Sequence, residues 1–122
     1  MRLRSVLVRA AIVEAMLAAA AHASTADEIE HLLAYVGGSG CTFLRNGVEY
    51  DAAAARKHLE TKYGYAKSRV HSADDFVHLL ASRSSMTGEP YVVRCGSSSQ
   101  FRSEDWLMDE LGSYREDDRP PS

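Results

Sequence analysis

The chain has 122 residues, of which 45% are hydrophobic and 25% charged, with 8 glycines and 3 prolines. This length suits one globular domain, and the apolar content excludes a wholly disordered chain. The sequence lacks a run of about 18 uncharged apolar residues, so it predicts no full-length membrane span.

The first 23 residues have the order of a secretory signal peptide. Arg2 and Arg4 give a basic start, residues 6–17 are mostly apolar, and residues 21–23 (Ala-His-Ala) form a small-x-small cleavage site. We therefore predict export and cleavage after Ala23. A surface amphipathic helix and an organelle transit peptide are the alternatives.

Cleavage there makes the remaining chain more acidic. Residues 24–122 keep 11 basic and 16 acidic side chains, a formal net charge of −5, because the leader takes three arginines and one glutamate with it. An acidic chain is repelled by phosphate backbones. We therefore predict no nucleic-acid partner.

The two cysteines, Cys41 and Cys95, both lie in this remaining part. An even number of cysteines in an exported chain favours one disulfide, with two unrelated buried thiols as the alternative. The sequence has no CxxC or HxxxH spacing, and two cysteines alone do not complete a four-ligand site. We predict neither a metal nor another cofactor.

In the first half of the chain, a capping box over residues 25–28 precedes apolar residues at helical spacing, and Gly37-Gly38 ends this predicted helix. Residues 41–45 and 48–50 are predicted strands joined by Asn46-Gly47, a strong hairpin signal. Asp51 caps a predicted helix over residues 52–63, which Gly64 ends.

In the second half, Ser72 and Asp75 predict the start of a helix that buries Phe76, Leu79 and Leu80. Residues 91–95 are a predicted strand after Pro90, which suits an edge strand. Residues 96–100 are a predicted connector. A last helix starts at Ser103 and carries four large side chains: Trp106, Leu107, Leu111 and Tyr114.

These elements predict an α+β fold, in which about three antiparallel strands pack against about four helices on one face. The domain is expected to span residues 24–115 and to end in a disordered acidic tail, residues 116–122. The disulfide would join the start of the first strand to the end of the last, which lie side by side in an antiparallel pair.

Several segments resemble the YfeK-like proteins, small exported bacterial proteins of unknown function. The similarity runs from about Thr25 to Trp106 and includes the stretches 39–47, 58–62, 69–70, 75–76 and 84–91. The resemblance implies export from a bacterial cytoplasm, to the periplasm, and implies no activity.

The sequence contains the residue types of a serine hydrolase, namely serines, histidines and aspartates: Ser84, Ser85, His58, His71, His78, Asp51, Asp74 and Asp75. However, the sequence has no G-x-S-x-G nucleophile elbow. We therefore assign no catalytic residue. His58 lies beside the apolar stripe of its helix, and a hydrogen-bonded structural role is the interpretation we prefer.

The loop over residues 84–88 supplies three hydroxyls and a glycine. This composition suits contacts with a sugar or a peptide, and it equally suits a turn whose hydroxyls bond their own backbone. The segment Thr87-Gly88-Glu89-Pro90-Tyr91 also resembles the S-G-x-x-Y motif of periplasmic lysozyme inhibitors, with Thr in place of Ser. The candidate binding residues are Arg45, Asn46, Arg69, Ser84, Ser85, Thr87, Gly88 and Tyr91.

A basic group (Arg56, Lys57, Lys62, Lys67 and Arg69) stands out in an acidic chain. It suits an anionic glycan, a lipid headgroup or an acidic partner, and a solvated helix face is the preferred alternative. Together, the sequence predicts a non-enzymatic envelope protein that binds another envelope protein or a cell-wall component. The alternatives are a small cell-wall or peptide hydrolase and a lysozyme-type or toxin-neutralising inhibitor.

Overall fold

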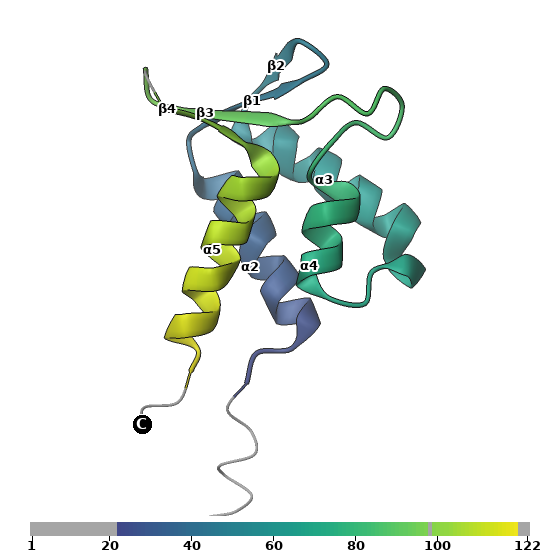
Figure 1. Cartoon of the computed structure of the whole chain (residues 1–122), viewed down its shortest axis with the longest axis vertical. Helices are drawn as coiled ribbons and strands as arrows, with labels where there is room; N and C mark the ends of the chain where they lie inside the picture. Colours follow the sequence, from purple (N-terminus) through teal and green to yellow (C-terminus); the bar gives the residue numbers. More distant parts are fainter. Residues whose placement is uncertain (1–21, 98, 120–122) are drawn as a thin grey trace, which may run out of the picture.

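The computed structural model describes residues 22–97 and 99–119, and the predicted signal peptide falls almost entirely outside them (Figure 1). The fold is α+β, as the sequence predicts. The elements in chain order are α2 (Thr25–Gly38), β1 (Thr42–Arg45), β2 (Val48–Tyr50), α3 (Ala52–Ala66), η1 (Lys67–Arg69), α4 (Ala73–Asp75), η2 (Phe76–Leu80), β3 (Val92–Cys95), β4 (Ser99–Arg102) and α5 (Ser103–Asp117).

In the described part of the chain, the sheet has four antiparallel strands in the order β2-β1-β3-β4. The prediction of about three strands was one short, because residues 99–102 form β4, where the sequence suggests a connector ending at Gln100. All four residues of β4 are exposed, so no apolar alternation marked this strand. Because β4 pairs with β3, β3 is interior and Pro90 lies before it.

The hairpin between β1 and β2 has the turn that its sequence predicts. Asn46 and Gly47 have φ values of +52° and +77°, and they join the paired residues Arg45 and Val48. Two successive residues with positive φ make a type I′ turn, whose twist matches that of the strands. This turn fixes where the side chain of Arg45 leaves the sheet.

The helix ends differ from the predicted ones by one to three residues. Ser24, one residue before the predicted capping box, caps α2, because its hydroxyl accepts from the Asp27 N–H at 3.1 Å. α2 also includes both glycines that were expected to end it, and Gly37 leaves room for the side chain of Arg56 on α3. α3 continues through Gly64, because Ala66 is buried in the core.

The short helix α4 is capped by Ser72 as predicted and continues into η2, a π-helical turn. Phe76, Val77 and Leu80 are buried there. The prediction that Leu79 is buried was wrong, since this side chain is 53% exposed. A π-helical turn holds more residues than an α-helical turn, so the apolar spacing read from the sequence does not place Leu79 on the core side.

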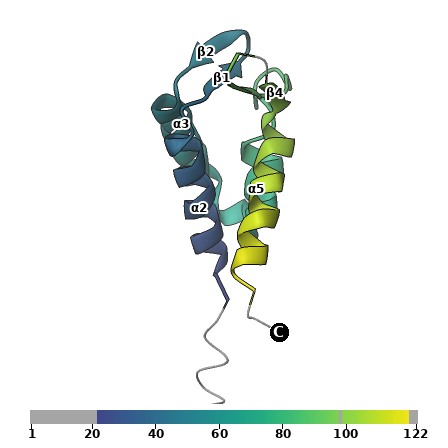
Figure 2. The same cartoon turned by 90° about the vertical axis from the view of Figure 1, so that its left-hand side faces the viewer.

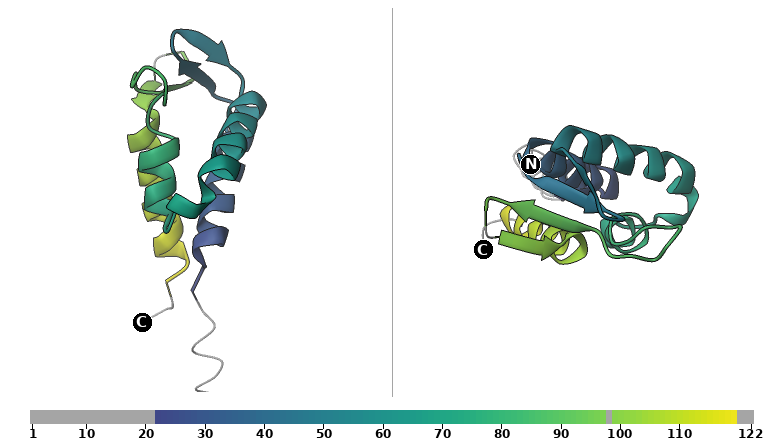
Figure 3. Two further views of the ribbon diagram at one scale, coloured as in Figure 1. Left: turned by 90° about the vertical axis from the view of Figure 1, so that its right-hand side faces the viewer. Right: turned by 90° about the horizontal axis from the view of Figure 1, so that it is seen from above.

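The sheet lies at one end of the helices, and all the helices lie on one side of it (Figures 1 and 2). Seen from above, the strands lie over α2 and α5, and α3 runs lengthwise beside them (Figure 3). Phe43 and Val93 face the helices, and the core beneath them is formed by side chains of α2, α3, η2 and α5: Ile29, Leu32, Leu33, Val36, Leu59, Phe76, Val77, Leu80, Leu107 and Leu111.

α2 and α5 run antiparallel, so the start of α2 and the end of α5 lie together (Figure 2). Arg115 on α5 forms an ion pair with Glu28 of α2 at 2.7 Å, which joins the two helices. It also pairs with Asp74 of α4 at 2.6 Å. α5 extends to Asp117, and residues 116 and 117, expected in the tail, are therefore helical. Residues 120–122 of the predicted tail lie outside the described part.

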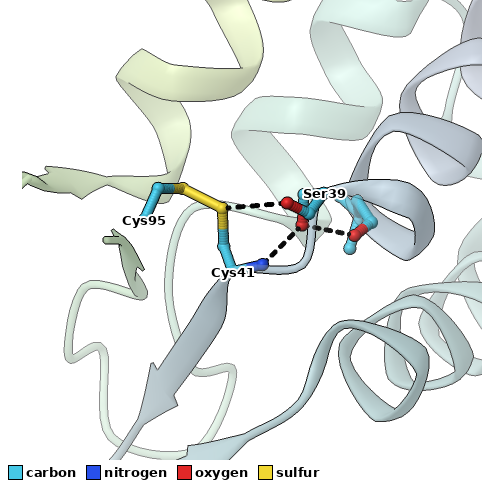
Figure 4. Close-up of a disulfide and its surroundings, with 4 residues drawn as sticks. Ser39, Cys41 and Cys95 are labelled. Carbon is cyan, nitrogen blue, oxygen red and sulfur yellow. Dashed lines mark hydrogen bonds between the residues drawn. A yellow bond between two sulfur atoms is a disulfide. The ribbon is translucent and has the colours of Figure 1, made fainter. Parts of the chain in front are cut away.

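Cys41 and Cys95 form the predicted disulfide, with their Cα atoms 4.6 Å apart (Figure 4). They flank the paired residues Thr42 and Arg94, so the bond joins the start of β1 to the end of β3. The hydroxyl of Ser39 accepts from the Cys41 N–H at 3.2 Å and holds the approach to β1. None of the helices in the described ranges has the length and apolarity that a bilayer crossing needs.

Candidate functional site

A cleft of about 380 Å³ opens between the β1–β2 hairpin, α3 and the loop that precedes β3. We call it the cationic cleft, and its lining residues are Arg45, Asn46, Val48, Tyr50, His58, Lys62, Ser84, Ser85, Met86 and Tyr91. Five of these belong to the binding residues predicted from the sequence: Arg45, Asn46, Ser84, Ser85 and Tyr91.

Arg45 lies at the end of β1, where the hairpin turn begins. Its guanidinium donates from Nη2 to the hydroxyl oxygen of Tyr50 at 2.9 Å, and from Nη1 to Nδ1 of His58. It also lies over the ring of Tyr50, 4.4 Å from the ring centre. These contacts hold the guanidinium across the cleft.

α3 contributes His58 and Lys62 to the same cleft. They are four residues apart, a spacing that places two side chains on one helix face. Lys62 Nζ donates to the hydroxyl oxygen of Tyr91 at 3.1 Å and to the carbonyl of Arg83 at 3.3 Å. The preferred interpretation of Lys62 as part of a solvated face was therefore incomplete, because this lysine is half-buried in a cleft.

The contacts of His58 fix the position of its proton. Arg45 only donates, so Nδ1 of His58 accepts, and the proton lies on Nε2. Nε2 then donates to the hydroxyl oxygen of Tyr91 at 3.3 Å. His58 is thus a hydrogen-bonded histidine, as the sequence analysis prefers, and it connects Arg45 to Tyr91.

Burial and positive charge shift the ionisation of these groups. Burial, with the charges of Arg45 and Lys62, lowers the pKa of His58 to about 4, so its ring is neutral at pH 7. Burial and the charge of Arg45 also lower the pKa of Lys62. Burial raises the pKa of Tyr91, while Arg45 opposes that rise, so the phenol keeps its proton at pH 7.

The cleft offers donors to a ligand and has no carboxylate among its lining residues. Within the described part of the chain, neither Arg45 nor Lys62 forms an ion pair with an acidic side chain. Arg45 uses two of its five N–H groups, Lys62 uses two of three, and Tyr91 accepts two bonds and retains its own O–H. Such an array of donors suits an oxyanion.

The loop over residues 84–88 forms one wall of the cleft. Ser84 is buried, and its hydroxyl oxygen accepts from the N–H groups of Met86 and Thr87 at 3.3 Å. Gly88 has a φ of +74°, as a turn glycine does. These contacts are the ones expected for a turn whose hydroxyls bond their own backbone. Ser85 is exposed and lines the cleft.

Asn46 links the hairpin to this loop. Its amide nitrogen donates to Ser84 at 3.2 Å, and its amide oxygen accepts from the Thr87 hydroxyl at 2.7 Å. Asn46, Ser84 and Thr87 therefore position the wall of the cleft, and Thr87 does not line it. The role of these residues in binding stays a prediction.

The structure does not bring Arg69 to the cleft. Arg69 is exposed in η1, beyond the end of α3 that lies away from the sheet (Figure 1). Of the other basic residues, Arg56 pairs with Glu30 and Glu60. The basic group of the sequence analysis is thus divided, and Lys62 alone faces the cleft.

The binding residues expected from the sequence do not include Tyr50, His58 or Lys62, which line the cleft. Two features of the sequence could have indicated them. His58 and Lys62 have the four-residue spacing that places side chains on one helix face, and Tyr50 pairs with a residue of β1 across the hairpin. Among the described residues, no three His, Cys, Asp or Glu side chains gather in a way that would hold a metal ion.

A family model described as "Family of unknown function (DUF5329)" matches residues 23–115. The chain belongs to this family. The matched region includes both cysteines and every residue that lines the cationic cleft.

The chain is also 42% identical over 50 residues to the uncharacterized protein YfeK of Salmonella typhimurium. The match covers 41% of this chain and 42% of that relative's length. It confirms the resemblance to YfeK-like proteins. No solved structure matches the chain.

Proposed function

We propose that this chain is an exported, non-enzymatic binding protein of the bacterial envelope that holds an anionic group of its partner in the cationic cleft. One observation carries the proposal: Arg45 and Lys62 meet in one cleft, and the described residues that line it include no carboxylate. A cation taken out of water is costly unless an opposite charge accompanies it. A ligand anion would supply that charge.

Binding without a reaction is favoured by the state of His58. Its Nδ1 lone pair is engaged by Arg45 and its proton by Tyr91, so neither ring nitrogen is available as a general base. Ser84, the buried serine of the cleft, bonds to Asn46 and to its own loop. This arrangement lacks a nucleophile hydrogen-bonded to a base.

The experiment is a titration of the full chain with inorganic phosphate at low salt, followed by amide chemical shifts. The shifts are expected to move at residues 45–50 and 84–91. Lys62→Met keeps the aliphatic stem and removes the charge, and we expect it to weaken phosphate binding by about tenfold or more, since bonds to charged groups contribute about 1.5–3 kcal/mol.

Lys57→Met is the matched control, because Lys57 is an exposed lysine of the same helix outside the cleft. It changes the net charge equally and should leave phosphate affinity nearly unchanged. Equal weakening by the two substitutions would mean general charge attraction, and the proposal would be wrong. Absence of phosphate binding to the parent chain would also refute it.

Export is the second part of the proposal, and it rests on the order of charge, apolar residues and small residues in positions 1–23. The expected mature chain starts at Ser24, at the cap of α2. Intact-mass measurement of the protein from a periplasmic fraction tests this. Protein that keeps residues 1–23, or that is absent from the fraction, would contradict export.

A further inference from the structure

An apolar recess lies directly beside the cationic cleft. Its lining includes Phe43, Ala55 and Leu59, and it shares four lining residues with the cleft: Arg45, Tyr50, His58 and Tyr91. A group held by the cations therefore lies next to an opening lined mostly by carbon atoms. Phosphate has no apolar part to fill such a recess.

The size of the recess limits what it holds. Its volume is about 40 Å³. A cavity needs about 10–15 Å³ to hold one water, and an apolar cavity of about 150 Å³ binds benzene. The recess therefore suits a methyl to isopropyl group and is too small for an aromatic ring.

The rest of the cleft is larger than one carboxylate needs. Its outer part presents Asn46 and Ser85, which can bond to amide groups, and two exposed apolar side chains, Val48 (52% exposed) and Met86 (92% exposed). A mixture of polar groups and exposed apolar side chains suits a peptide backbone with its side chains.

From these three observations we infer that the cleft and its recess bind the free carboxyl end of a peptide whose last side chain is small and aliphatic. At a peptide end, the carboxylate and the last side chain are attached to the same Cα atom. The carboxylate then meets Arg45 and Lys62 while the side chain enters the recess, and the preceding residues follow the outer part of the cleft. This inference rests on the proposed function, since it names the ligand of the same cleft.

The test uses four short acetylated peptides and inorganic phosphate, with affinities measured by calorimetry on the full chain. The reference is acetyl-Ala-Ala-Ala with a free carboxylate. Its C-terminal amide should bind about tenfold or more weakly, because the charge is lost. Acetyl-Ala-Ala-Gly should bind about fourfold more weakly for its missing methyl group. Acetyl-Ala-Ala-Phe should also bind more weakly than the reference, since its ring exceeds the recess.

A variant separates the recess from the cations. Ala55 lines the recess, and Ala55→Leu should fill it. We expect this variant to lose the preference for Ala over Gly at the peptide end while it still binds phosphate, which also shows that it is folded. Ala53→Leu, on an exposed position of the same helix, is the control and should keep the preference.

The outcomes distinguish this inference from the proposed function. If the amide binds as well as the acid, or Gly as well as Ala in the parent chain, the peptide-end inference is wrong. Phosphate binding with none of the peptide preferences would leave the anion-binding proposal in place and overturn only the inference. If phosphate does not bind the parent chain, the proposed function is wrong, and the inference that rests on it is wrong as well.

Discussion

At the scale of single residues, His58 shows how position decides chemistry. Burial and the charges of Arg45 and Lys62 keep its ring neutral at pH 7. The neutral ring accepts a hydrogen bond from Arg45 and donates one to Tyr91. A bound anion would act in the opposite direction, because a negative charge favours the protonated forms of His58 and Lys62. Occupancy of the cleft and protonation are therefore linked.

The depressed pKa of His58 predicts a pH dependence of stability. Above about pH 6.5 the ring is neutral in both the folded and the unfolded chain, so it contributes none. Between about pH 6.5 and 4 the unfolded chain takes up a proton that the folded chain resists. The free energy of unfolding should therefore decrease as the pH is lowered from about 6.5 to 4.

We expect His58→Gln to flatten this part of the profile, as measured by urea unfolding at several pH values between 7.5 and 4. His71→Gln, which removes an exposed histidine outside the cleft, is the matched control. The explanation would be abandoned if the parent chain and His58→Gln lost stability equally between pH 6.5 and 4.

At the scale of elements, the short-range signals in the sequence act where the backbone needs them. Asp51 accepts from the Ala54 N–H at 2.8 Å and begins α3, and Ser72 accepts from the Asp75 N–H at 3.0 Å and begins α4. Signals for helix ends were weaker. A glycine costs a helix only about 1 kcal/mol, and burial of Ala66 beyond Gly64 offsets most of that cost.

Two glycines give opposite predictions for the same substitution. Gly64 lies within α3 with open space around it, so Gly64→Ala should raise the free energy of unfolding by about 0.5–1 kcal/mol. Gly47 has a φ of +77°, so Gly47→Ala should lower it by about 1–2 kcal/mol, although a methyl group meets no atom there.

Urea unfolding of both variants checks this pair of predictions. Because Gly47 lies in the turn that joins Arg45 to Val48, the Gly47→Ala variant should also bind phosphate more weakly than Gly64→Ala. A destabilised Gly64→Ala variant would mean that α3 does not continue through this position in solution.

At the scale of the whole molecule, the disulfide joins the two central strands of the sheet near the end of α2 (Figure 4). The bond closes a segment that contains α3, α4 and every residue that lines the cationic cleft. The cysteines are 54 positions apart, and a loop of this length contributes about 4 kcal/mol in the chain-entropy account.

Reduction should therefore lower the free energy of unfolding by about 4 kcal/mol, a large share of the roughly 5–15 kcal/mol of a whole domain. Urea unfolding with and without a reductant measures the difference. The double variant Cys41→Ser with Cys95→Ser is the control and should not respond to the reductant. Equal stability of the oxidised and reduced parent chains would contradict this role of the bond.

The outcome for the fold follows from the range over which each signal acts. Caps, the Asn46-Gly47 turn and the cysteine pair are read over a few residues or from simple counts, and the sequence predicted all three, with one cap displaced to Ser24. β4 and the exposed Leu79 were missed, because an exposed strand and a π-helical turn leave no apolar period to read.

By itself the sequence determined the α+β class, the disulfide and the family, since these depend on composition, local hydrogen bonding and ordered motifs. Only the tertiary structure decided the cleft. Arg45, Lys62 and Tyr91 are distant along the chain, and the residues next to each of them in the sequence do not mark a binding site. They meet because the hairpin, α3 and the loop before β3 pack around one opening, in which the charged groups are partly buried together. Packing between distant segments leaves no pattern in any one segment of the sequence.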